Sequence, residues 1–189
     1  MRIRIRTVCG ALATATLVGA LAGCIPDAGS GRPERTGDGS IPGDIPDAAF
    51  AVIVDDIVDG DTLRAHADTS GELGDDTESE RIRLIGIDTP ELKPEPECGA
   101  QAASDRLRQL LPPGSTAWAL GDAGERDRYD RALLYLWNTE GTFVNLELVA
   151  DGSAKTLSVE PNTRYATDLA AAEAASRADE RGLWSSCQR

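Results

Sequence analysis

The sequence predicts an α+β fold, and a small five-stranded β-barrel with helices packed on it is one arrangement that satisfies the pattern. Strand-like segments occur three times before the first helical pattern and twice after it. Two more helical patterns follow toward the end of the chain. With 41% hydrophobic residues in a chain of 189, one modest core can form. The sequence has no internal repeat, and nothing in it indicates a second core.

The strands are recognised by β-branched residues or by alternation. Residues 51–58 are rich in Val and Ile, and Asp59-Gly60 after them is a hairpin turn signal. In residues 62–67, Leu63 and Ala65 alternate with polar neighbours, as in a half-buried strand. The expected strands are 51–58, 62–67, 81–87, 115–120 and 131–137.

Three helices are expected from apolar residues at helical spacing. The helix at 98–111 is stopped by Pro112, the helix at 143–151 by Gly152, and the Ala-rich helix at 163–181 by Gly182. By contrast, residues 68–80 have no apolar face and many acids, so we expect an exposed loop.

The first 23 residues have the pattern of an export signal. Three arginines form a positive head, and an apolar run follows to Ala22. The run ends in Leu21-Ala22-Gly23-Cys24, which resembles the lipobox of bacterial lipoproteins, where Cys24 becomes the lipidated N-terminus. Ordinary cleavage after Ala22 is the alternative. The chain is therefore expected to be exported, either as a lipoprotein of the cell envelope or as a secreted protein.

The number of cysteines favours lipidation. Without the leader, Cys24, Cys98 and Cys187 remain, and an odd cysteine is unusual in an exported protein. If Cys24 carries lipid, Cys98 and Cys187 can pair in an oxidising compartment, which would contribute about 4–5 kcal/mol in a chain-entropy model. Two buried free thiols are the alternative.

Between the leader and the domain lies a segment without apolar periodicity. Residues 24–47 are crowded with Gly, Pro, Asp and Ser, and we expect a disordered tether. Residues 48–189 then form the folded domain. The leader holds three of the 19 basic residues and none of the 32 acidic ones, so the remaining chain has a formal charge of −16. This charge argues against a protein that binds nucleic acid over a broad surface.

Several kinds of site are excluded or weak. His66 is the only histidine, which argues against a Ser-His-Asp triad and against a histidine-rich zinc site. There is no phosphate-binding P-loop pattern. Three clusters of charged residues remain: "DGDT" at 59–62, "RLIGIDTPE" at 83–91 and "RDRYDR" at 126–131. Alone, the first is typical of a hairpin, the second of a strand followed by a turn that proline sets, and the third of a solvated turn.

Together these clusters resemble the staphylococcal nuclease (thermonuclease) family. The motifs "VN" in "FVNLELVADG" and "GLW" near the end also match, in the same order and at similar spacing, so the resemblance runs from about residue 51 to residue 184. It implies an OB-fold barrel. It also implies a calcium-dependent endonuclease that hydrolyses DNA and RNA and leaves 3′-phosphate ends.

The resemblance assigns a role to each matching residue. Asp61 and Asp88 are similar to the calcium carboxylates, and Thr89 to the residue that offers its backbone carbonyl. Glu91 is similar to the glutamate beside the attacking water. The arginines that hold the scissile phosphate correspond to Arg83 and Arg131, and the contacts to a neighbouring phosphate to Arg128 and Tyr129.

These residue types suit that chemistry. Calcium is a hard cation that takes oxygen ligands, and planar guanidinium groups match two phosphate oxygens. Three acids, two arginines and a calcium ion give a site of net charge +1, whereas the site without calcium is −1. We therefore expect calcium to be needed for binding the substrate as well as for its hydrolysis.

The chain departs from the family in two places. Asp130 replaces the usual glycine, and we expect the turn to survive because Asp tolerates a left-handed backbone. In "TLSVEP", Leu157 and Val159 stand where stacking tyrosines are expected, which predicts weaker nucleotide binding.

Two alternative functions are compatible with an exported barrel. One is a catalytically silent OB-fold module that binds a nucleic acid or a protein at the cell surface. The other is a structural envelope lipoprotein. Neither needs the full set of acids and arginines, so the nuclease reading is favoured. A monomer, anchored to a membrane through Cys24, is expected.

Overall fold

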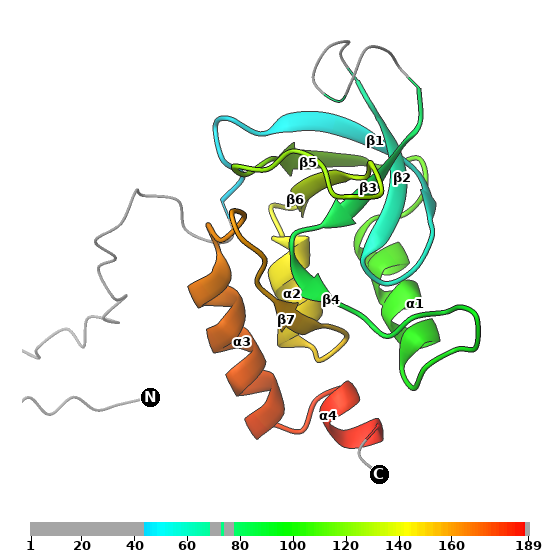
Figure 1. The fold of residues 1–189 in the computed structure, drawn as a ribbon, viewed down its shortest axis with the longest axis vertical. Helices are drawn as coiled ribbons and strands as arrows, with labels where there is room; N and C mark the ends of the chain where they lie inside the picture. Colours follow the sequence, from blue (N-terminus) through cyan, green and yellow to red (C-terminus); the bar gives the residue numbers. More distant parts are fainter. Residues whose placement is uncertain (1–43, 69–72, 74–77, 188–189) are drawn as a thin grey trace, which may run out of the picture. The chain divides into compact units, whose positions relative to one another are not determined.

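The computed structural model describes residues 44–68, 73 and 78–187 (Figure 1). Its centre is a closed barrel of five strands in the order β1-β2-β3-β6-β5. The expected α+β class and the five-stranded OB-fold barrel are therefore confirmed. The barrel strands are β1 (Phe50–Ile57), β2 (Thr62–Ala67), β3 (Glu80–Leu84), β5 (Thr116–Leu120) and β6 (Ala132–Asn138).

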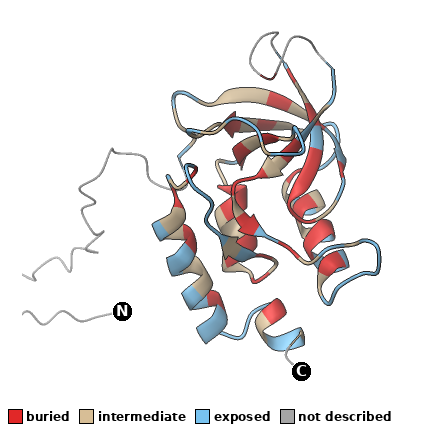
Figure 2. Ribbon diagram, viewed as in Figure 1, coloured by how far each residue is buried: buried red, intermediate tan, exposed pale blue. Residues whose placement is uncertain are grey.

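Alternation of side chains fills the barrel. Val52 and Val54 of β1, Leu63 of β2 and Ile82 of β3 are almost completely buried inside the barrel. Figure 2 marks the buried parts of the strands and helices in red. β3 and β6 run parallel, and the other barrel neighbours run antiparallel. A parallel pair needs a crossover, which here passes through the first helix and β5.

The predicted strand 81–87 was wrong in one respect, because it is broken at Ile85. β3 ends at Leu84, and β4 (Gly86–Asp88) leaves the barrel to pair with β7 (Lys155–Leu157), a strand that was not predicted. Gly86 has φ of +80°, and a Cβ there would lie 2.5 Å from Cδ1 of Leu169. The glycine thus permits the turn that carries Asp88 away from the barrel wall.

Helices cover one side of the barrel. The three predicted helices are present with shorter bounds, as α1 (Ala100–Leu110), α2 (Val144–Ala150) and α3 (Ala166–Ala178), and a short α4 (Leu183–Ser186) was not predicted. The third helix ends before Gly182 because Glu180 adopts a left-handed φ of 52°. In Figure 1, α2 lies between the barrel and α3.

Aromatic rings and one buried amide hold α2 in place. Trp137 of β6 stacks on Phe143 with 4.5 Å between ring centroids, and Tyr165 packs against both rings. Asn145, from the "VN" motif, is fully buried. Its Nδ2 donates to the Ile85 carbonyl at 2.9 Å, and its Oδ1 accepts from the Leu136 amide at 3.0 Å. The amide therefore fixes α2 to the point where β3 and β4 separate.

The N-terminal predictions fall mostly outside the described residues. The leader, Cys24 and residues 25–43 of the tether lie there, as do residues 69–72 and 74–77 of the acidic loop. Ile45, inside the predicted tether, packs against the core. None of the helices in the described ranges has the length and hydropathy to cross a bilayer.

Candidate active site

Asp61 is held in a buried position at the β1–β2 turn. Asp61 is only 4% exposed, and its Oδ2 accepts a hydrogen bond of 2.9 Å from the Thr89 amide. The Thr62 hydroxyl donates to Oδ1 at 3.0 Å. Burial raises the pKa of Asp61 from 3.8 to about 6, although the Arg83 guanidinium partly offsets this. Asp61 is therefore a buried acid that a nearby cation stabilises.

The turn needs a glycine before Asp61 because the chain passes close to two neighbours. A Cβ at Gly60 would lie 2.7 Å from Cβ of Ala103 in α1 and 2.7 Å from Oγ1 of Thr89. Thr89 is the residue whose amide holds Asp61. Because Gly60 has no side chain, the turn can lie close to both α1 and Thr89, which holds Asp61.

Substituting Gly60 by alanine is expected to lower the free energy of unfolding by about 1–3 kcal/mol, because the added methyl group must displace Ala103 or Thr89. Urea unfolding measures the effect. Gly121→Ala is the matched control, because a Cβ at Gly121 has no heavy atom within 4 Å. Equal stability of the two variants would contradict the proposed contact.

Arg83 joins the two predicted metal carboxylates. Its Nη2 lies 3.1 Å from Oδ2 of Asp61 and 3.1 Å from Oδ1 of Asp88. Its Nη1 donates to the Leu84 carbonyl at 2.6 Å. Asp61 comes from the β1–β2 turn and Asp88 from the end of β4, so acids from distant segments meet at one guanidinium.

Arg131 contacts the same corner through the hydroxyl of Thr62. Its Nη1 donates to the Thr62 hydroxyl at 3.3 Å, and that hydroxyl donates to Asp61. Arg131 is positioned by Asp127, whose Oδ2 accepts from Nε at 2.7 Å and whose Oδ1 accepts from the Arg131 amide at 3.0 Å. Arg83 and Arg131 therefore approach the Asp61–Thr62 corner together.

Asp127 is a positioning residue that the sequence analysis missed. Besides Arg131, it accepts a hydrogen bond from the Tyr129 amide at 2.9 Å, which closes the turn. The motif spacing D-x-Y-x-R was the available signal, since an Asp side chain often bonds to amides that follow it. Asp130 in this turn has φ of 62°, as expected for the glycine position, and its charge faces Arg126 rather than Arg131.

The hydrogen bonds of Asp127 predict a pH-dependent stability. Burial acts to raise the pKa of Asp127, but the hydrogen bonds from Arg131 and Tyr129 outweigh it and hold the pKa below 3.8. A folded-state pKa below the unfolded value contributes stability above pH of about 3.8, and this is lost as the pH falls. Asp127→Asn is expected to lose about 1–3 kcal/mol at pH of about 7. Urea unfolding should show this difference from wild type shrinking below pH of about 3.8, and a constant difference would contradict it.

Arg128 and Tyr129 form an exposed pair beside Arg131. Arg128 Nη2 donates to the Tyr129 hydroxyl at 2.7 Å, and its guanidinium lies 4.7 Å from the ring centroid. The Arg131 guanidinium lies 5.6 Å from the same ring. Tyr129 is 61% exposed, so this face is open to a ligand.

Glu91 lies in the loop that follows β4 and is exposed. Its amide donates to Oε2 of Glu97 at 3.2 Å, and the Glu97 amide donates to the Glu91 carbonyl at 2.9 Å. Partial burial and then the charges of Asp59 and Asp88 raise the pKa of Glu91 above 4.5, against the effect of Arg83. A carboxylate with a raised pKa is a better proton acceptor.

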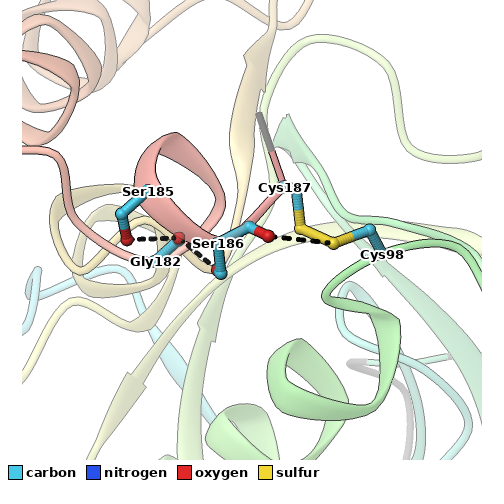
Figure 3. Close-up of a disulfide and its surroundings, with 5 residues drawn as sticks. All are labelled: Cys98, Gly182, Ser185, Ser186 and Cys187. Carbon is cyan, nitrogen blue, oxygen red and sulfur yellow. Dashed lines mark hydrogen bonds between the residues drawn. A yellow bond between two sulfur atoms is a disulfide. The ribbon is translucent and has the colours of Figure 1, made fainter. Parts of the chain in front are cut away.

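The loop that carries Glu91 ends at a disulfide between Cys98 and Cys187. The bond joins residues 89 apart in sequence and ties α4 to the segment before α1 (Figure 3). The hydroxyls of Ser185 and Ser186 donate to the Gly182 carbonyl at the start of α4. Glu97, the disulfide and Trp184 line one pocket of about 290 Å³.

The oxygen atoms around Asp61 could supply some, but not all, of the ligands of a hard divalent cation. Asp61 and Asp88 converge, and Thr89 lies beside Asp61 with a carbonyl of its own. No group of three or more His, Cys, Asp or Glu in the described ranges is arranged to hold a metal. Two carboxylates and one carbonyl leave room for water and substrate oxygens, which suits calcium.

His66 lies apart from this arrangement. Its Nδ1 is 2.8 Å from Oδ1 of Asp55 on the outside of the barrel. Leu157 and Val159, where stacking tyrosines were expected, are exposed. Lys155 stands opposite Asp88 in the β4–β7 pairing. The sequence did not predict this neighbour because it did not predict β7.

Comparison with known proteins gives a consistent result. The family model described as "Staphylococcal nuclease homologue" matches residues 81–186. Endonuclease YhcR of Bacillus subtilis is 32% identical over 142 residues, covering 70% of this chain and 11% of that protein. Thermonuclease of Staphylococcus intermedius is 29% identical over 135 residues, covering 70% and 74%. An uncharacterized endonuclease of Escherichia coli O157:H7 is 31% identical over 131 residues, covering 68% and 73%.

Several relatives are much longer than the matched region. The chain covers 61% of endonuclease YncB and 44% of the prophage-derived endonuclease YokF, both from Bacillus subtilis, in addition to 11% of YhcR. The chain therefore spans only part of the length of these relatives.

Proposed function

Because this chain belongs to the staphylococcal nuclease family, we propose that it is an exported calcium-dependent endonuclease that hydrolyses DNA and RNA to 3′-phosphate ends. One observation carries the proposal. Asp61 and Asp88 converge within 3.1 Å of the same Arg83 nitrogen, and Arg131 is linked to Asp61 through the Thr62 hydroxyl. A silent binding module would not need this convergence.

Asp61, Asp88 and the Thr89 carbonyl would hold the calcium ion. When bound, calcium supplies positive charge beside the phosphate and neutralises the two carboxylates. In its absence the acids outnumber the arginines, so phosphate binding should be weak. Arg83 is shielded by the acids that it contacts, with its side chain only 12% exposed.

The protein's own groups account for the remaining chemistry. Arg83 and Arg131 donate hydrogen bonds to the non-bridging oxygens of the scissile phosphate, where negative charge grows during attack. Glu91 accepts a proton from the attacking water, whose oxygen forms a bond to phosphorus. The P–O5′ bond breaks, the 5′ oxygen takes a proton from solvent, and the phosphate stays on the 3′ side.

Arg128 and Tyr129 would contact a neighbouring phosphate and its nucleotide. Both groups are exposed on the turn that Asp127 organises. Without aromatic residues at positions 157 and 159, base stacking should contribute less to affinity than in a site that has them.

Export and anchoring are part of the same proposal. The disulfide between Cys98 and Cys187 supports an oxidising compartment. The leader and the lipobox-like Leu21-Ala22-Gly23-Cys24 support a lipid anchor on Cys24. The mature protein would then act as a monomer at a membrane surface.

Activity is expected with calcium and not with a chelator. Purified protein is incubated with single-stranded DNA and with RNA, and end groups are identified by sensitivity to a 3′-phosphatase. Glu91→Gln, which keeps the size of the side chain, should lower kcat by about 10²–10⁴-fold. Binding of DNA without cleavage under all conditions would favour a silent module. Undiminished cleavage in chelator would overturn the calcium requirement.

A further inference from the structure

Two arginines face each other on the outer wall of the barrel. Arg64 of β2 and Arg81 of β3 are direct partners in the antiparallel register, and both are exposed. Their sequence neighbours Leu63 and Ile82 are buried inside the barrel, so the two arginines project outward. Like charges directly opposite each other destabilise a strand pair.

This pair has no acidic partner in the described part of the chain. Every other arginine described there makes a hydrogen bond, an ion pair or a ring contact. Asp56 of β1 stands opposite Arg64 in the register, but the two side chains form no ion pair. In a chain with 32 acidic and 19 basic residues, two facing arginines left without a carboxylate indicate a place for an external anion.

The pair lies next to the candidate active site. Two residues along the same strands, Thr62 stands opposite Arg83, and both belong to the corner around Asp61. Residues two apart on a strand are separated by roughly 6.5 Å. One nucleotide step of an extended strand covers a comparable distance, so a chain held at Arg83 can place its next phosphates over Arg81 and Arg64.

We propose that Arg64 and Arg81 form a second phosphate-binding subsite, which takes backbone phosphates of the substrate strand next to the scissile one. The inference rests on the proposed nuclease function and adds a substrate class to it. The subsite favours strands several nucleotides long over dinucleotides, because only a longer strand reaches both positions. It also lets a strongly acidic protein bind a polyanion along the row of arginines on β2 and β3.

The test compares Arg64→Gln/Arg81→Gln with the wild type, both in a Glu91→Gln background that slows hydrolysis. Anisotropy of a labelled oligothymidylate of about ten nucleotides, a length within the range of one OB fold, is measured with calcium between about 50 and 200 mM salt. Two lost phosphate contacts should flatten the slope of log K against log salt by about 1.4. Over this range the wild type should lose about sevenfold more affinity than the variant.

Two further variants keep the result interpretable. Arg108→Gln/Arg164→Gln removes the same charge from arginines that already have acidic partners, and its slope should equal that of the wild type. Arg64→Lys/Arg81→Lys keeps the charge and should restore most of the slope. In the chain with Glu91 intact, Arg64→Gln/Arg81→Gln should raise the KM for the oligonucleotide more than for a dinucleotide.

The outcomes separate the two proposals. In one outcome the chain with Glu91 intact cleaves DNA, while the salt dependence of binding, measured in the Glu91→Gln background, is the same with and without Arg64→Gln/Arg81→Gln. That result overturns the subsite and leaves the nuclease function in place. A wild-type chain that binds without cleaving overturns the nuclease function, yet a flatter slope in the double variant still supports the subsite. No binding by the wild type overturns the subsite.

Discussion

Replacing Arg83 by alanine is expected to lower kcat for phosphodiester hydrolysis by about 10²–10³-fold, the usual cost of removing one donor to a transition-state oxygen. One nitrogen of Arg83 lies 3.1 Å from both Asp61 and Asp88. Its loss removes a planar donor to the phosphate and leaves the buried Asp61 without its cation. The pKa of Asp61 should then rise further, because the Arg83 guanidinium lowers it more than the hydrogen bonds from Thr89 and Thr62 do. Single-turnover cleavage of a DNA oligonucleotide in saturating calcium measures the chemical step.

Arg83→Lys is the matched control. Lysine keeps the positive charge near the two acids but cannot donate two parallel hydrogen bonds, so kcat should lie between those of the wild type and Arg83→Ala. Circular dichroism checks that each variant is folded. A folded Arg83→Ala protein with the kcat of the wild type would contradict the proposed role of Arg83 as a hydrogen-bond donor to the scissile phosphate.

Removing the disulfide, by Cys98→Ser with Cys187→Ser, is expected to lower the free energy of unfolding by about 4–5 kcal/mol. The bond closes a loop between residues 89 apart, so the unfolded chain gains much freedom when it is absent. Urea unfolding under oxidising conditions measures the change. Cys98 directly follows the loop that carries Glu91 and Glu97, so kcat should fall as well when that loop loses its anchor.

Chemical reduction provides the control for the disulfide. A thiol reductant should bring the wild type to the stability of the double serine variant and leave that variant unchanged. If the two cysteine substitutions cost no stability, the bond does not constrain the unfolded chain as the loop length implies.

The barrel could be predicted because its strands carry their own signals. The β-branched run at 51–58 and the alternation at 62–67 match β1 and β2 to within one residue at each end. The acids and arginines of the candidate site were assigned from the resemblance to the staphylococcal nuclease family, and the comparisons confirm that family. Local sequence patterns were enough to predict an element wherever its residues show β-branched enrichment or a regular alternation of apolar and polar residues.

The missed features depend on contacts between distant segments. β7 has only three residues, too few to show alternation, and it exists because Gly86 turns β4 out of the barrel toward it. Asp127 looks like one acid among several in an exposed turn, and its role appears only once Arg131 folds back onto it. The pairing of Arg64 with Arg81 likewise needs the register of β2 and β3.

The attachment of α2 through Asn145 gives the molecule a natural reporter of its internal motions. The Leu136 N–H is held by the helix side chain rather than by a neighbouring strand. Hydrogen–deuterium exchange at this single amide therefore follows the undocking of α2, whereas most amides of the same strand follow the opening of the sheet. One exchange time course resolved to single residues can separate the two events without any substitution.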